Sequence, residues 1–130
     1  MTILVGYLPT PQGEAALDAA IAEAALRDTD LVVVNSPRRG ATVDADLVGD
    51  DASTALVERA SARGVTARVD HALHEDLADT LHSLVQETGA DLVVIGLRHR
   101  SPVGKLLMGS DAQKILLSAE VPVLAVKAPR

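Results

Sequence analysis

Asp91-Leu92-Val93-Val94-Ile95-Gly96 is the stretch of the sequence that decides the fold. Its centre is an uninterrupted aliphatic run, and a glycine follows directly. Such a run is typical of a strand that is buried on both faces, as the inner strands of parallel sheets are. We therefore expect a strand at residues 91–96, covered by helices above and below.

Further strands and helices alternate on both sides of this stretch. Apolar runs predict four more strands, at Ile3–Leu8, Leu31–Val34, Val65–Leu73 and Val121–Lys127. Apolar residues spaced three and four apart predict the intervening helices. The predicted helices are a first one after residue 13, a second over Ser53–Arg63, a third that ends at Gly89 and a short fourth one at Ser110–Ser118. The expected inward-facing residues are Leu17, Ala20, Ile21, Ala24 and Ala25 in the first helix, Leu56, Val57 and Ala60 in the second, and Leu77, Leu81, Leu84 and Val85 in the third.

This alternation predicts the α/β class, with a five-stranded parallel sheet and helices on both of its faces. We find no linker and no internal repeat, so residues 1–130 are expected to form a single domain. The polar and acidic segment Arg38–Asp51 is the most loop-like part of the chain.

The composition excludes several classes of function. A formal net charge of −6 argues against a nucleic-acid-binding protein and against adhesion to anionic membranes. The absence of cysteine excludes disulfides, thiol nucleophiles and zinc–thiolate sites. The sequence shows no signal peptide, and no apolar run approaches the ~20 residues that span a bilayer. We therefore expect a soluble, cytoplasmic protein.

Two segments fall where ligands bind in open parallel sheets, beyond the carboxyl ends of strands at the point where the winding reverses. They are Leu8–Gly13 and Gly96–Ser110. In the second segment, Gly109-Ser110 leads into a helix whose free N–H groups and dipole favour an anion such as phosphate. The same segment carries three cations and no acid, at Arg98, Arg100 and Lys105. The alternative is that its glycines only shape a surface loop and that Ser110 only caps a helix.

The spacing within this segment resembles that of the universal stress protein family, Gly-x2-Gly-x9-Gly-Ser/Thr. The chain has Gly96, then His99 after two residues, and Gly109-Ser110 after nine more. The opening Ile3–Gly6 and the closing Pro122–Val126 also fit. The resemblance implies a Rossmann-like sheet, of the kind found in adenine nucleotide alpha hydrolases, with strand order 3-2-1-4-5. It also implies a homodimer that pairs through the last strand, Val121 to Val126.

In nucleotide-binding members of the family, the glycine loop holds the phosphates of ATP, which is usually bound with Mg. The resemblance therefore implies that Gly96, Gly109 and Ser110 bind the phosphates of an adenine nucleotide. Arg98 and Arg100 would assist through charge-assisted hydrogen bonds.

The chain departs from the family pattern at three positions. His99 replaces the middle glycine, Leu8 stands where an Asp holds the nucleoside, and Asp111 follows Ser110. Two hypotheses therefore remain open. One is a regulatory module that binds an adenine nucleotide, and the other is a nucleotide-free structural or protein-binding dimer of the same family.

Other sites find little support in the sequence. A P-loop would need Gly and Ser/Thr where the chain has His99 and Leu106. A group of titratable residues consists of His71, His74, Glu75, Asp76, Asp79 and His82. Their spacing is not that of a recognised metal site, and the acidic members predict the start of a helix. We predict no catalytic residue and no metal ligand, so any ATP hydrolysis would be slow and incidental.

Overall fold

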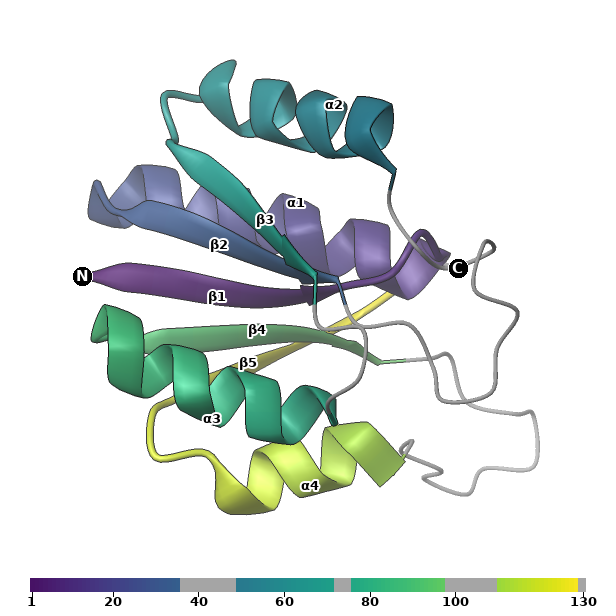
Figure 1. The fold of residues 1–130 in the computed structure, drawn as a ribbon, viewed down its shortest axis with the longest axis vertical. Coiled ribbons are helices and arrows are strands. Elements are labelled where there is room, and N and C mark those ends of the chain that lie inside the picture. The colour runs from purple at the N-terminus through teal and green to yellow at the C-terminus, as the bar shows by residue number, and fades with distance from the viewer. Residues whose placement is uncertain (36–48, 72–75, 98–109, 129–130) are drawn as a thin grey trace.

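The computed structural model describes residues 1–35, 49–71, 76–97 and 110–128, with Ser110 and Asp111 described by their backbone alone (Figure 1). These residues form five strands and four helices in strict alternation. The strands are β1 (Thr2–Tyr7), β2 (Asp30–Asn35), β3 (Ala67–His71), β4 (Leu92–Leu97) and β5 (Val123–Lys127). The helices are α1 (Pro11–Arg27), α2 (Asp50–Ser61), α3 (Leu77–Thr88) and α4 (Ser110–Ser118).

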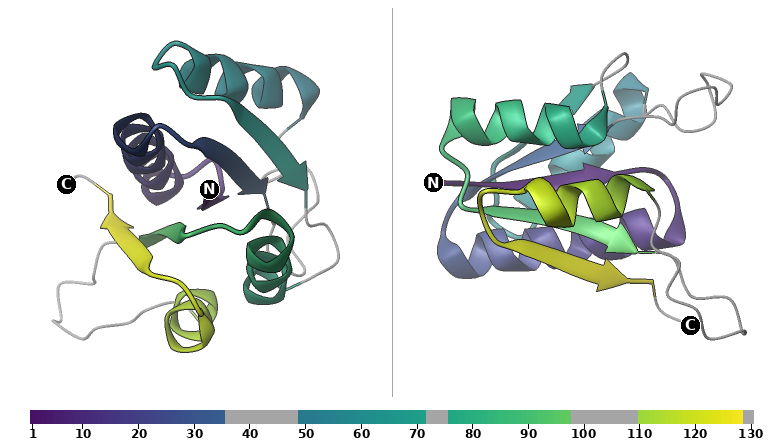
Figure 2. Two further views of the ribbon diagram at one scale, coloured as in Figure 1. Left: turned by 90° about the vertical axis from the view of Figure 1, so that its left-hand side faces the viewer. Right: turned by 90° about the horizontal axis from the view of Figure 1, so that it is seen from below.

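The strands form one parallel sheet in the order β3-β2-β1-β4-β5, which confirms the predicted class and order. Helices α1 and α2 cover one face of the sheet, and α3 and α4 cover the other (Figure 2). The winding therefore reverses between β1 and β4, which lie side by side at the centre of the sheet.

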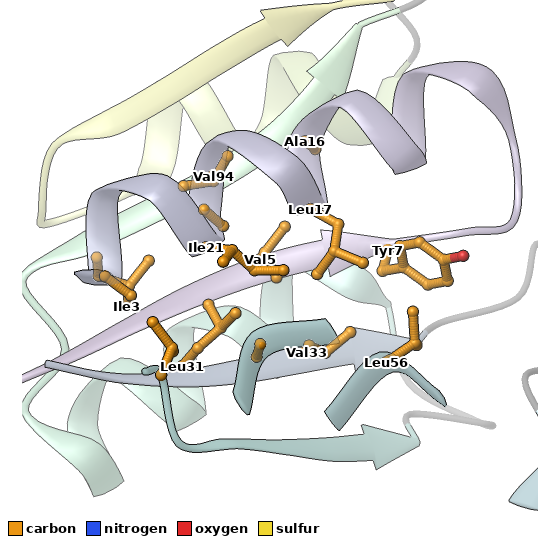
Figure 3. Packing of buried hydrophobic residues seen from close by; sticks show 14 of the residues in the cluster. Ile3, Val5, Tyr7, Ala16, Leu17, Ile21, Leu31, Val33, Leu56 and Val94 are labelled. Atoms are coloured by element: carbon orange, nitrogen blue, oxygen red, sulfur yellow. The ribbon is translucent and has the colours of Figure 1, made fainter. Parts of the chain in front are cut away.

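Alternating side chains divide the interior into two cores, one on each face of the sheet. In β1, Ile3, Val5 and Tyr7 point toward α1 and α2, whereas Leu4 points toward α3 and α4 (Figure 3). β2 and β4 alternate in the same way and are buried on both faces. This is the double burial that their unbroken aliphatic runs predict.

The first core is thin because α1 presents mainly alanines to the sheet. Its buried residues are Gly13, Ala16, Leu17, Ala20, Ile21 and Ala24. Ala25, predicted to face inward, is exposed in the last turn of the helix, beyond the buried stripe that ends at Ala24. Thr10 caps this helix, with its Oγ1 accepting a hydrogen bond from the Gly13 N–H at 3.1 Å, and Pro11 occupies the first helical position.

The observed bounds differ from the predicted ones by two residues or more at α2, β3 and β5, and β5 begins at Val123 rather than Val121. Helix α2 begins at Asp50 rather than Ser53, so the acidic end of the predicted loop forms the first helical turn. Carboxylates are favourable there because they face the positive end of the helix dipole. Residues 38–48 of that predicted loop lie outside the described residues. Strand β3 begins at Ala67 rather than Val65 and is described as far as His71, and residues 72–73 of the predicted strand lie outside the described residues.

The third helix ends as predicted. Gly89 follows α3 with a φ of 67°, in the left-handed region, and its N–H donates to the carbonyl of Val85. None of the described helices is long and apolar enough to cross a bilayer.

Candidate functional site

The point where the winding reverses lies at the carboxyl ends of β1 and β4. From β1 the chain passes into α1 on one face, and α4 lies on the opposite face. The first residues of α1 and α4 both lie at this edge of the sheet (Figure 1). The carboxyl edge therefore carries helix N-termini from both faces, beside the ends of the two central strands.

The structure describes two of the four predicted site residues. Gly96 lies near the end of β4, and Ser110 is the first residue of α4. Arg98 and Gly109 lie outside the described residues, as do Arg100 and His99. The topology thus brings Gly96 and the start of α4 to the same edge.

Gly96 also has a packing role that sequence reasoning missed. A Cβ atom at Gly96 would lie 2.3 Å from the backbone oxygen of Gln12, in the first turn of α1. Real Cβ atoms do not approach a carbonyl so closely, so only glycine lets α1 lie against β4 here. The signal in the sequence is a glycine at the end of a central strand, which is compatible with close backbone packing as well as with a ligand contact.

The turn between β1 and α1 is equally tight. A Cβ atom at Gly13 would lie 1.9 Å from the carbonyl oxygen of Leu8, and the Thr10 N–H donates to that same oxygen at 2.8 Å. Leu8, at the position where the family pattern has an Asp, is the half-buried first residue of this turn. The first turn of α1 is thus drawn close to the end of β1.

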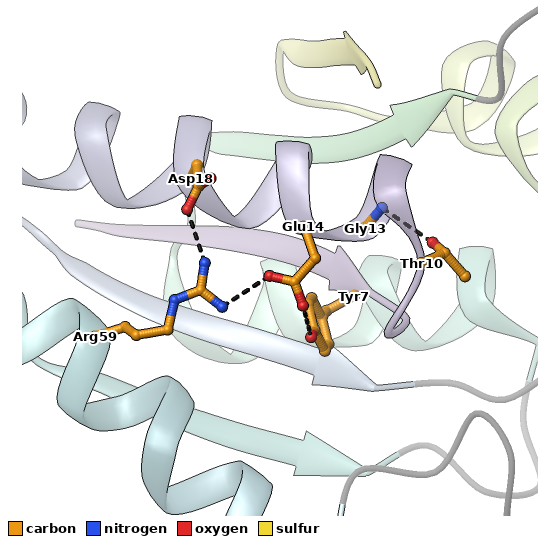
Figure 4. Close-up of polar contacts among 6 residues, drawn as sticks. All are labelled: Tyr7, Thr10, Gly13, Glu14, Asp18 and Arg59. Atoms are coloured by element: carbon orange, nitrogen blue, oxygen red, sulfur yellow. Dashed lines mark hydrogen bonds and ion pairs between the residues drawn. The ribbon is translucent and has the colours of Figure 1, made fainter. Parts of the chain in front are cut away.

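A polar cluster joins α1, α2 and the end of β1, and consists of Tyr7, Glu14, Asp18 and Arg59 (Figure 4). The Tyr7 hydroxyl donates to Glu14, and Arg59 donates to Glu14 at 2.7 Å and to Asp18 at 2.8 Å. Tyr7 itself is buried, with 5% of its surface exposed. It is therefore a packed strand residue whose only polar atom is satisfied by α1.

The cluster shifts the pKa values of its members. Burial, together with the hydrogen bond and charge of Glu14, raises the pKa of Tyr7 well above its usual range. Burial alone would raise the pKa of Glu14, but hydrogen bonds from Tyr7 and Arg59 and the charge of Arg59 outweigh it and lower that pKa. The hydrogen bond to Glu14 raises the pKa of Arg59 further. Glu14 is therefore ionised in the folded protein at neutral pH.

We expect Arg59→Met to lower the free energy of unfolding by about 1 kcal/mol at pH 7, because the pair is half-exposed and solvent screens it. The pKa of Glu14 is lower in the folded protein than in the unfolded chain. Its contribution is therefore present above the unfolded pKa and is lost as pH falls through the folded pKa. Urea unfolding at pH 7 and pH 3 checks this, with the difference between variant and parent shrinking at pH 3.

Arg63→Met is the matched control, since Arg63 is exposed two residues beyond α2. We expect it to leave stability within about 0.5 kcal/mol of the parent at both pH values. An equal loss for both variants would show that Arg59 acts by general surface charge.

The described members of the predicted titratable group do not form a metal site. Asp76 caps α3 and accepts a hydrogen bond from Lys114 of α4, while Asp79 and His82 are exposed on α3. Within the described ranges, no three or more His, Asp or Glu side chains come together as metal ligands. His74 and Glu75 lie outside those ranges.

Comparison with known proteins identifies relatives over almost the whole chain. A sequence model of the universal stress protein family matches residues 1–127. A universal stress protein of Mycolicibacterium smegmatis is 41% identical over 125 residues, which cover 96% of this chain and 96% of that protein.

Solved structures share the fold. A universal stress protein from Archaeoglobus fulgidus is 30% identical and matches with a TM-score of 0.80 over 98% of both chains. A structure of the universal stress protein from A. fulgidus in complex with dAMP is 26% identical, with a TM-score of 0.72 over 98% of both chains.

Proposed function

The chain belongs to the universal stress protein family, and from that premise we propose that it is a regulatory module that binds an adenine nucleotide at the carboxyl edge of its sheet. The observation that carries the proposal is the match to the dAMP complex over 98% of both chains. The ligand is of the ATP type, held with Mg when triphosphate is bound. The module is one cytoplasmic domain, residues 1–130, with little or no catalysis.

The proposed phosphate ligands lie around the start of α4. Gly96, Gly109 and Ser110 offer backbone N–H groups and a hydroxyl, and Arg98 adds positive charge. Support comes from Gly96 at the end of β4 and from the first turn of α4, which lie at one edge of the sheet. A helix N-terminus at this position stabilises an anion through its free N–H groups and dipole.

The direct test is the ultraviolet spectrum of the purified protein, followed by chromatography of its acid extract. The chain has one Tyr and no Trp, so its own near-ultraviolet absorbance is weak and bound adenine dominates the spectrum. An adenine nucleotide in the extract supports the proposal. A clean extract together with no response to millimolar Mg-ATP (roughly the weak limit of specific binding) contradicts it.

A nucleotide-free dimer is the second candidate, and Leu8 favours it. An aliphatic side chain begins the turn after β1, where the family pattern places an Asp that holds the nucleoside. Leu8 offers no hydrogen bond from its side chain to ribose or base. In this alternative, the carboxyl edge is structural and the protein acts through a partner chain.

Both candidates include a homodimer through β5. The two edges of the sheet differ: β3 carries the Arg68–Asp70 ion pair, whereas Val123, Leu124 and Val126 of β5 are only half-buried. Charged residues protect an edge strand from pairing, and an aliphatic edge favours pairing. We propose that the β5 strands of two copies pair with each other.

We expect Ala125→Pro to convert the dimer into a monomer. The Val93 N–H donates to the carbonyl of Pro122, so alternation along β5 directs the N–H of Ala125 away from β4, toward the outer edge. Proline removes that donor but is tolerated on an edge strand. Light scattering coupled to size exclusion measures the mass. Ala125→Val, which keeps the N–H, should remain dimeric, and an unchanged mass for both variants would place the interface elsewhere.

A further inference from the structure

The last residues of three neighbouring strands form a hydrogen-bonded row at the carboxyl edge. In the sheet register, Tyr7 of β1 pairs with Asn35 of β2, and Asn35 pairs with His71 of β3. The Asn35 side chain is fully buried, and its Nδ2 donates to the carbonyl oxygen of Tyr7 at 3.2 Å. Its Oδ1 lies 3.3 Å from Nδ1 of His71.

These contacts assign the tautomer of His71. The carbonyl oxygen of Tyr7 can only accept, so the amide of Asn35 must turn its Nδ2 toward Tyr7 and its Oδ1 toward His71. Since Oδ1 also can only accept, Nδ1 of His71 carries the proton. The other ring nitrogen, Nε2, is therefore a hydrogen-bond acceptor when the imidazole is neutral. His71 is exposed, so this acceptor belongs to a side chain accessible at the carboxyl edge.

The row lies at the same carboxyl edge of the sheet as the start of α4. The next step rests on the proposed function, which places the phosphates at the start of α4, beyond β4. Adjacent strands lie ~4.8 Å apart, so the ends of β2 and β3 lie roughly 10 and 14 Å from the end of β4. A nucleotide that extends from β4 across β1 therefore brings its base toward Asn35 and His71.

We propose that His71 is the residue that makes this site specific for a 6-aminopurine, by accepting a hydrogen bond at Nε2 from the exocyclic amino group. Adenine presents an amino donor at that position, whereas a 6-oxopurine presents a carbonyl acceptor. Two acceptors that face each other leave both groups unpaired, which disfavours the oxopurine. Asn35 is a positioning residue, because it holds the imidazole in the tautomer that accepts.

The test compares AMP with IMP, which differ at the 6-position, by calorimetric titration at pH 8.5, where imidazole is ordinarily neutral. We expect the parent to bind AMP about 10-fold more tightly than IMP. His71→Asn retains an N–H that can donate to Asn35 but lacks the Nε2 atom. We expect it to reduce the AMP/IMP ratio to about 1, chiefly by weakening AMP. His82→Ala, an exposed histidine on α3, is the control and should keep the parent's ratio.

Each outcome bears on a different claim. If the parent binds AMP and His71→Asn keeps the parent's ratio of AMP to IMP affinity, His71 does not determine specificity. The proposed function then still stands. Equal binding of AMP and IMP by the parent leads to the same two conclusions. Failure of the parent to bind either nucleotide overturns both the specificity and the proposed function.

Discussion

Gly96→Ala should destabilise the protein by about 3 kcal/mol, the upper part of the usual range for overpacking. The added Cβ would lie 2.3 Å from the backbone oxygen of Gln12 and 2.7 Å from its carbonyl carbon. Both atoms belong to the backbone of the first turn of α1, so no side-chain rotation relieves the overlap. The helix must move away from β4, and its buried alanines lose contact with the sheet. Urea unfolding followed by circular dichroism measures the change.

Gly6→Ala is the matched control from the neighbouring strand. A Cβ at Gly6 would lie 3.5 Å from Cδ2 of Leu77, which is ordinary van der Waals contact. We expect this variant to unfold within about 1 kcal/mol of the parent, since it fills space without overlap. If Gly96→Ala is as stable as Gly6→Ala, then α1 does not lie against β4 as described, and the geometry of the carboxyl edge is wrong.

Gly109→Val should abolish nucleotide binding while leaving the fold intact. A β-branched side chain before the first residue of α4 keeps the backbone N–H groups away from a phosphate and opposes left-handed backbone angles. Loss of two charge-assisted hydrogen bonds weakens binding by about 100-fold or more. Calorimetric titration with ATP and AMP measures affinity, and far-ultraviolet circular dichroism checks the fold. Gly96 cannot serve for this test, because its replacement disturbs packing.

Gly49→Val controls for the general effect of placing valine at a glycine before a helix. Gly49 precedes α2 with an extended backbone, φ −74° and ψ 177°, and a Cβ there would meet nothing within 4 Å. We expect this variant to bind nucleotide as the parent does. Parent-like affinity in Gly109→Val would instead show that Gly109 does not contribute to phosphate binding.

The sheet could be predicted from the sequence because its signals are local. Unbroken aliphatic runs such as residues 92–95 lie in doubly buried strands, and the alternation of strands with helical stripes determines the topology. The sequence does not reveal the start of α2, because Asp50 and Asp51 belong to a residue type that is common in loops. Their stabilisation comes from a helix dipole that exists only once the helix has formed.

The side-chain networks could not be predicted, because they join residues far apart in the sequence. Glu14 and Arg59 are 45 residues apart, and Asn35 and His71 are 36 apart. The sequence alone does not distinguish packing from ligand contact for Tyr7, and its burial beneath α1 shows that it packs. Asn35 ends an aliphatic run and looks like a turn residue there. Its full burial and its two partners follow only from the register of three strands.

Gly96 shows why a motif residue needs a structural explanation. The spacing Gly96–His99–Gly109 predicts a phosphate loop, and the fold places Gly96 at the expected edge of the sheet. Yet the contact with Gln12 requires a glycine at this position whether or not a nucleotide binds. The presence of Gly96 therefore supports the fold more strongly than it supports the ligand.

The most direct test of the central claim is a calorimetric titration of the nucleotide-free protein with AMP and with Mg-ATP. The proposed function predicts saturable binding of at least one of them, at one site per chain, with a dissociation constant below about 1 mM. The absence of binding heat at millimolar concentrations of both ligands, with no rise in melting temperature, would contradict it. The carboxyl edge would then be structural, and the β5 dimer would be the functional unit.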